Sequence, residues 1–228
     1  TAYEIYQCDW SSDVCSSDLG AELLEMSLED PELLEDAATI RRASTHLLEI
    51  VNNLLTLSRG QADGFRVRVE KVALPELVAE VCQPWLTVCS KKGIALDRQS
   101  RVPEGTQVMG DATALRQILQ NLISNAVKFT LEGGVKVELT ISDAHVRVTV
   151  SDTGKGIDPA LLPGLFQQFS TLDQWETRDQ HGAGLGLYLS QSLARAMETE
   201  IRVASEPGRG TAFSIDLPLV QPLTGTPA

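Results

Sequence analysis

The stretch "VRVTVSDTGKGI", Val146 to Ile157, places a strand directly before a glycine-rich turn. Its valines alternate with polar residues, which is the period of a half-buried strand. Asp152 is the next residue in the valine series, so its carboxylate is expected to point inward. Gly154 and Gly156 follow at once and permit tight turns and close approach of a ligand. A buried carboxylate needs a donor partner, which could be a nucleobase amino group or, alternatively, local backbone N–H groups.

The preceding helix is predicted over "DATALRQILQNLISNAVKF", Asp111 to Phe129, because its apolar residues recur at helical spacing. Asn121, Asn125 and Lys128 form a polar ridge beside that apolar stripe. Amide oxygens can bind Mg²⁺, and an ammonium can contact phosphate. An ordinary polar helix face is the alternative.

A third stretch, "HGAGLGLYLSQSLARAM", opens a helix with Gly182, Gly184 and Gly186. Backbone N–H groups at such a helix start can bind phosphate, although glycines there can also serve packing alone. No G-K-[ST] follows, so the stretch is not a P-loop. The glycine spacing also differs from the Rossmann fingerprint.

The remaining pattern predicts an α+β protein. Asp30-Pro31 starts a helix that runs to about Gly60 with a coiled-coil-like seam, and "GAELLEMSL" before it could be its antiparallel partner, which together make a helical hairpin. A mixed sheet with helices on one face, an α/β sandwich, is expected beyond it. Its predicted strands are 65–72, 94–97, 134–141, 145–152, 200–205 and 211–219, with a further helix over 74–92 that Gly93 stops.

Composition excludes several classes of protein. The net charge of −12 over 228 residues argues against a nucleic acid partner, since phosphate binding needs basic patches. The sequence has no apolar run long enough for a transmembrane helix and no signal peptide, so no membrane contact is expected within the chain. Cys82 and Cys89 are expected to be free thiols on one helix face.

The order of the three motifs, followed by "GRGT", resembles the nucleotide-binding domain of bacterial sensor histidine kinases. "HLLEIVNNLLTLSRGQ" resembles the second helix of that family's dimerisation and phosphoacceptor domain. The resemblance implies a truncated helical hairpin, half of a four-helix dimerisation bundle, over 20–60 and a linker over 61–65. It further implies a GHKL-type (HATPase_c) ATP-binding domain over 66–219, with a tail over 220–228.

The family's roles imply that ATP and Mg²⁺ bind along these motifs. Asn125 matches the Mg²⁺ ligand, with Asn121 beside it as a second candidate, and Asp152 matches the carboxylate that reads the adenine amino group. The other residues that match the family's ATP-binding positions are Lys128, Gly154, Gly156, Phe166, Phe169, Arg178, Gly182, Gly184, Leu185, Gly186, Gly208, Gly210 and Thr211. Ala183 departs from the pattern, because the family often has Thr there.

The resemblance implies a protein histidine kinase that passes the γ-phosphoryl group of ATP to a histidine and then to a response regulator receiver domain. The parent protein would be a homodimer through its helical bundle, with this region in the cytoplasm and an inner-membrane anchor elsewhere. An ATP-driven conformational clamp and a degenerate kinase that acts as a binding module are the alternatives.

The start of the chain departs from the family. The phosphoacceptor histidine is expected near Asp9, where neither a histidine nor its motif occurs; His46, His145 and His181 lie elsewhere. "DWSSDVCSSDL", Asp9 to Leu19, resembles one translated frame of a widely used sequencing adapter. Residues 1–19 are therefore expected to be adapter-derived and without a fold, and the chain is expected to bind ATP without phosphorylating itself.

Overall fold

The computed structural model describes residues 65–142, 144–168 and 184–220, together with scattered residues between Thr39 and Ser58. The chain divides into two compact units, Thr1–Thr56 and Leu57–Ala228. The described residues of the first unit are all helical. This agrees with the helix expected up to Gly60, whereas the expected partner helix and residues 1–19 lie outside the described residues.

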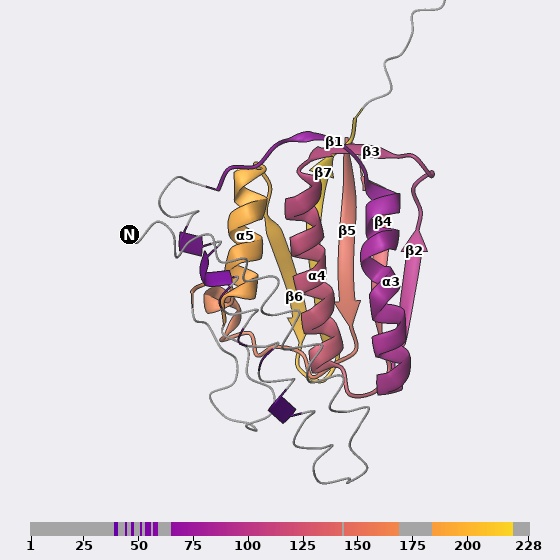
Figure 1. Cartoon of the computed structure of the whole chain (residues 1–228). Helices are drawn as coiled ribbons and strands as arrows, with labels where there is room; N and C mark the ends of the chain where they lie inside the picture. The colour runs from indigo at the N-terminus through magenta and orange to yellow at the C-terminus, as the bar shows by residue number, and fades with distance from the viewer. Residues whose placement is uncertain are drawn as a thin grey trace, which may run out of the picture. The chain divides into compact units, whose positions relative to one another are not determined.

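The second unit holds the sheet and three long helices (Figure 1). The helices are α3 (Leu74–Lys92), α4 (Ala112–Phe129) and α5 (Gly186–Ala196), and a short 3₁₀ helix, η2, spans Leu162–Gly164. The strands are β1 (Glu70–Ala73), β2 (Ala95–Ser100), β3 (Gln107–Gly110), β4 (Gly134–Ser142), β5 (His145–Asp152), β6 (Ile201–Glu206) and β7 (Gly210–Pro218).

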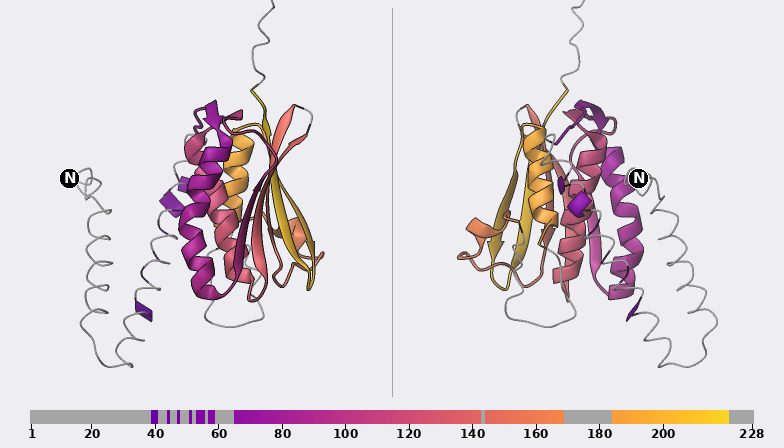
Figure 2. Two further views of the ribbon diagram at one scale, coloured as in Figure 1. Left: turned by 90° about the vertical axis from the view of Figure 1, so that its right-hand side faces the viewer. Right: turned by 60° about the vertical axis from the view of Figure 1, so that its left-hand side comes forward.

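Five strands form one sheet in the order β2-β4-β5-β7-β6, and β1 pairs with β3 separately. The β2–β4 pair is parallel and the other neighbours are antiparallel. The parallel pair needs a crossover connection, which α4 supplies. Figure 2 shows the three long helices as one layer against one face of the sheet. The two-layer α+β architecture predicted from the sequence is confirmed.

The core lies between these two layers. Val137, Val150 and Phe213 stand side by side on β4, β5 and β7 and are all buried. Ile118 and Leu122 on α4 are also fully buried. They belong to the apolar stripe from which the sequence predicted this helix. Cys82 and Cys89 are buried free thiols on α3, as predicted. Burial raises the pKa of the Cys82 thiol to about 11, so it packs as an apolar group.

The strand predicted over 65–72 is wrong in its first part, and one strand of the structure was not predicted. Residues 65–69 have no strand pairing, and only Glu70–Ala73 of the expected strand forms β1. Alternation there reflects partial packing, because Phe65 and Val67 lie against the core while Arg66 and Arg68 are exposed. The partner of β1 is β3, a strand too short to give a sequence signal.

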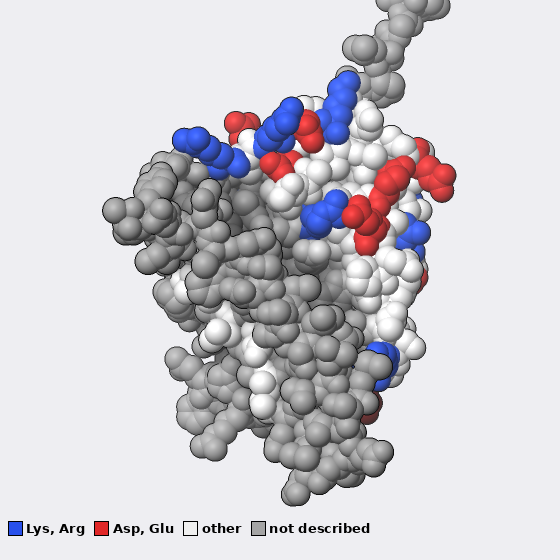
Figure 3. Space-filling view, viewed as in Figure 1, with Lys and Arg blue, Asp and Glu red and all other residues white. Residues whose placement is uncertain are grey.

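On the helix side, Arg116 of α4 pairs with Glu80 of α3 at 2.8 Å. Over the described part of this face, Lys and Arg side chains lie among Asp and Glu side chains (Figure 3). None of the helices that the structure describes combines the length and the apolar character needed to span a bilayer.

Candidate functional site

Asp152 ends β5, and its side chain is half-buried on the side facing the helices. Oδ1 accepts hydrogen bonds from the backbone N–H groups of Gly154, at 2.8 Å, and Thr211, at 3.3 Å. Oδ2 has no hydrogen-bond partner among the described residues. Burial raises the pKa of this carboxyl, while the two backbone bonds oppose the shift. One oxygen is therefore fixed by the backbone and the other remains available to an external donor.

The turn after β6 closes against Asp152. Gly210 has φ +101°, and a Cβ there would overlap the carbonyl oxygen of Asp152. Gly156, with φ +70°, likewise approaches the carbonyl oxygen of Glu206 too closely for a side chain. The Gly208 N–H donates to the carbonyl of Lys155 at 2.8 Å. The segments that carry Gly156 and Gly210 are far apart in sequence, and their backbones can pack together because glycine has no side chain.

A hydroxyl pair supports this junction. Ser205 Oγ accepts from the Ile157 N–H at 2.8 Å, donates to the Gly210 carbonyl at 3.0 Å and lies 2.9 Å from Thr211 Oγ1. Thr211 is therefore held by Ser205 as well as by Asp152. Ser205 was not among the predicted site residues, and no local motif marks it, because its role depends on a turn formed by both segments.

The C-terminal turn of α4 lies beside the same glycines. A Cβ on Gly154 would overlap the carbonyl oxygen of Phe129, so this glycine permits close packing of the turn on the helix end. Lys128 Nζ and Lys155 Nζ lie 5.0 and 5.3 Å from the centroid of the Phe129 ring. Two ammonium groups therefore gather on one aromatic ring at this end of the helix.

The two predicted amide ligands differ in their surroundings. Asn121 Nδ2 donates to Ser190 Oγ of α5 at 2.9 Å, and Asn121 Oδ1 lies against the Cα of Gly186. Asn121 therefore contributes to packing between α4 and α5. Asn125, one turn further along, is half-buried and makes no side-chain hydrogen bond within the described residues. Its amide oxygen is free to act as a ligand to Mg²⁺.

The described residues contain no cluster of His, Cys, Asp or Glu suited to hold a metal ion by itself. An amide ligand such as Asn125 suits Mg²⁺ that takes its other ligands from phosphate oxygens and water. The Asp152 carboxylate, the Asn125 amide and the ammonium groups of Lys128 and Lys155 therefore fit Mg²⁺-nucleotide chemistry as a set.

Among the predicted glycine and aromatic positions, Phe166 stacks edge-on against Phe213 of β7, with centroids 6.4 Å apart. Leu185 is buried and Gly184 has φ +64° just before α5. The predicted residues Phe169, Arg178 and Gly182 lie outside the described residues.

The comparisons with known proteins agree on one family. Residues 110–221 match the family described as histidine kinase-, DNA gyrase B- and HSP90-like ATPase. The chain is 34% identical over 203 residues to the autoinducer 2 sensor kinase/phosphatase LuxQ of Vibrio cholerae, which covers 87% of the chain and 24% of the relative. It is 35% identical over 206 residues to the sensor protein GacS of Pseudomonas syringae, covering 86% of the chain and 22% of the relative.

Solved structures share the fold. Full-length ShkA in complex with AMPPNP superposes with a TM-score of 0.73 at 30% identity, covering 94% of this chain and 44% of ShkA. The catalytic domain of the histidine kinase ThkA has a TM-score of 0.57 at 25% identity, covering 67% of this chain and 96% of that one.

The chain spans about a quarter of the length of LuxQ, so these likenesses concern its kinase region. The chain is also similar to the sensor protein EvgS of Escherichia coli, with 33% identity over 178 residues, which covers 76% of this chain and 15% of EvgS. Residues 110–221 therefore belong to the histidine kinase-, DNA gyrase B- and HSP90-like ATPase family, and this chain carries the ATP-binding catalytic domain of a sensor histidine kinase.

Proposed function

We propose that this domain binds Mg²⁺-ATP between the end of β5, the C-terminal turn of α4 and the turn that carries Gly210 and Thr211. The observation that carries the proposal is the Asp152 carboxylate, with Oδ1 fixed by two backbone N–H groups and Oδ2 without a partner among the described residues. An adenine amino group would donate to Oδ2, which would relieve the cost of the buried carboxylate. The glycines at 154 and 156 let the turn after β5 pack closely on the Phe129 and Glu206 carbonyls, which fixes the turn beside this carboxylate.

The phosphate end of the nucleotide would lie toward Asn125 and Lys128. In this proposal Asn125 donates its amide oxygen to Mg²⁺, and Lys128 contacts phosphate. Mg²⁺ would neutralise charge on the transferred phosphoryl group. Arg178, Gly182 and Gly184 would contact the phosphates from the segment before α5, and Gly186 from the first residue of α5.

The proposed reaction is transfer of the γ-phosphoryl group to a histidine on the helical bundle of a dimer, followed by transfer to an aspartate of a response regulator. The domain's own contribution is to position the nucleotide and stabilise charge, which is how phosphoryl transfer is catalysed. The homology to sensor kinases supports this reaction for the parent protein.

Isothermal titration of the full chain with Mg²⁺-ATP tests the binding site. Asp152→Asn keeps an acceptor for the N–H groups of Gly154 and Thr211 but presents an amide to adenine in place of the carboxylate. We therefore expect ATP affinity to fall by at least about a hundredfold, because a buried polar group would lose its partner.

Burial raises the pKa of Asp152, so its ionisation costs stability as pH rises through that pKa. The variant should therefore unfold at the same or a higher temperature at pH 7. Unchanged affinity would refute the site.

We propose further that residues 1–19 are adapter-derived and that this chain, without the acceptor motif near Asp9, binds ATP but does not phosphorylate itself. Incubation with γ-labelled ATP should leave no acid-labile label on the chain. Label that survives base and is lost in acid would contradict this proposal. Sequencing of the genomic locus gives a separate test, because codons for residues 1–19 in genomic DNA would exclude an adapter origin.

A further inference from the structure

The last turn of α4 ends without a glycine cap. Thr130 follows the helix in extended conformation, with φ −97° and ψ 114°. The final carbonyls of a helix have no partner within it and must find one elsewhere. The Ala126 carbonyl accepts from the N–H of Thr130 at 3.1 Å and from its hydroxyl at 2.7 Å. The Phe129 carbonyl faces the Cα of Gly154.

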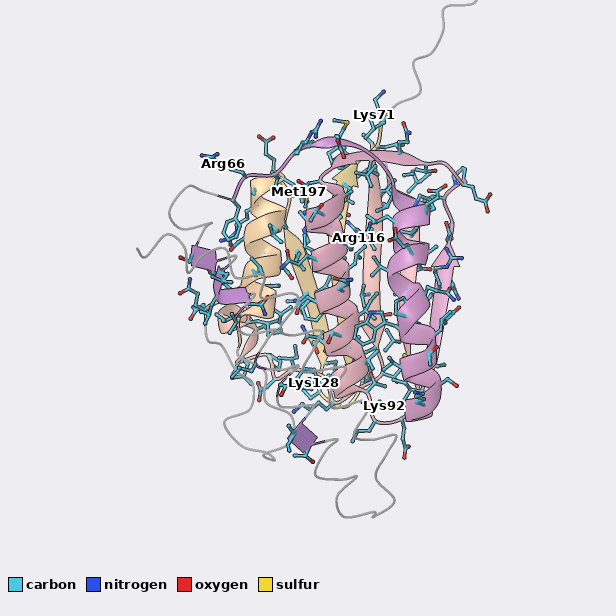
Figure 4. The ribbon with its side chains drawn as sticks, viewed as in Figure 1. Arg66, Lys71, Lys92, Arg116, Lys128 and Met197 are labelled. Carbon is cyan, nitrogen blue, oxygen red and sulfur yellow. The ribbon has the colours of Figure 1, made fainter. Side chains whose placement is uncertain are left out.

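The two carbonyls between them are bound from another helix. Lys92, the last residue of α3, donates from Nζ to the Val127 carbonyl at 2.5 Å and to the Lys128 carbonyl at 3.2 Å. Lys92 and Lys128 are labelled at the same end of their helices in Figure 4. A side chain 35 residues away in sequence thus caps the turn of α4 that carries Asn125 and Lys128.

This arrangement addresses an electrostatic problem. The C-terminus of a helix carries about half a negative charge, so it repels anions, whereas the N-terminus of a helix attracts them. In the proposed site the polyphosphate lies near the C-terminal turn of α4. An ammonium bound directly to the terminal carbonyls offsets that negative end and still adds positive charge close to the phosphates.

We infer that Lys92 is a positioning residue for the nucleotide: it compensates the negative end of α4 and fixes the turn from which Asn125 and Lys128 reach the phosphates. The inference rests on the proposed ATP site and extends it to a residue outside the four motifs. Its distinctive consequence is a dependence on nucleotide charge. Loss of the ammonium should weaken the binding of ATP more than that of ADP, and the binding of ADP more than that of AMP.

The test compares Lys92→Gln, which keeps an N–H donor but removes the charge, with Lys92→Arg, which keeps both. Titration of the full chain without Mg²⁺ should show ATP binding about tenfold weaker in Lys92→Gln, within the range of a charge at a helix terminus. The loss should be smaller for ADP and smallest for AMP, and Lys92→Arg should bind within about twofold of the wild type. Thermal unfolding of each variant checks that the fold persists.

Lys91→Gln is the matched control, since it removes the same charge from the neighbouring residue, which makes no contact with α4 carbonyls among the described residues. ATP affinity within about twofold of wild type is expected there, because salt screens exposed charges. Equal effects of the two Gln variants would overturn the inference, as would an equal loss for all three nucleotides. A wild-type chain that binds ATP neither with nor without Mg²⁺ would instead refute the proposed function on which the inference rests.

Discussion

The two ends of α4 are built in different ways. At its N-terminus, Asp111 caps the helix by itself, accepting from the N–H groups of Thr113 at 2.9 Å and Ala114 at 3.0 Å. At its C-terminus, the capping groups come from Thr130 and from Lys92 on another helix, and Gly154 packs on the last carbonyl. One end is capped by an adjacent residue, whereas the other also needs groups from distant parts of the chain.

The difference corresponds to what each end does. The N-terminal end ties the helix to the chain before β1, because Asp111 Oδ2 also accepts from the Arg68 N–H at 2.7 Å. The C-terminal end faces the proposed nucleotide site, where close approach of backbone segments matters more than local capping. Changes at the C-terminal end should therefore affect nucleotide binding and stability together, and changes at the N-terminal end should affect stability alone.

Gly210→Ala should have the largest effect. The residue would need φ near +101° and its Cβ would overlap the Asp152 carbonyl, so we expect a loss of about 2–4 kcal/mol in the free energy of unfolding and weaker ATP binding. Urea unfolding and ATP titration measure the two effects. Gly208→Ala is the control in the same turn: its φ is +76° but nothing lies within 4 Å of the new Cβ, so a loss of about 1 kcal/mol is expected. Equal losses would mean that the close approach at Gly210 is unimportant.

Asp111→Ala tests the other end of α4. Removing an N-cap carboxylate should lower the free energy of unfolding by about 1–2 kcal/mol. Asp111→Ser retains a capping oxygen and should recover most of that loss in the same urea unfolding experiment. Because this end lies away from the proposed site, ATP affinity should stay within about twofold of the wild type for both variants, as for independent, distant sites. A large loss of affinity would show that the two ends are coupled.

The smallest effect is expected on the polar side of the sheet, which touches neither end of α4. Arg147 donates two hydrogen bonds to Asp216, at 2.7 and 2.8 Å, and these bonds hold the pKa of the Asp216 carboxyl below its usual value. A depressed carboxyl pKa gives stability that is present above the ordinary Asp range near about 4 and is lost as pH falls through the lowered pKa. Asp216→Asn should therefore lower stability slightly at pH 7 and make unfolding less dependent on pH in acid. An unchanged acid profile would contradict the role of this pair.

The same contrast explains how far the sequence could predict the molecule. The range of α4 and the inward direction of Asp152 could be predicted from the local spacing of apolar residues. The capping role of Asp111 depends only on the residues that directly follow it. The pairing of β1 with β3 could not be predicted, because each strand has four residues and carries little periodic signal.

Within the site, the contact of Gly210 with Asp152 and the capping of α4 by Lys92 were also beyond prediction from spacing. Both join segments that are far apart in the chain, and neither residue type identifies its partner. The glycines could be predicted as places of close approach, but only the structure shows which segment approaches each one.

Hydrogen–deuterium exchange of the full chain with and without saturating Mg²⁺-ATP tests the central claim most directly, because it locates the ligand along the backbone. The account predicts added protection at residues 125–130, 152–157 and 205–211, which surround the C-terminal end of α4, and no change at residues 107–116, around its N-terminal end. Protection confined to residues 107–116, or no added protection at the three C-terminal segments when ATP is bound, would contradict it.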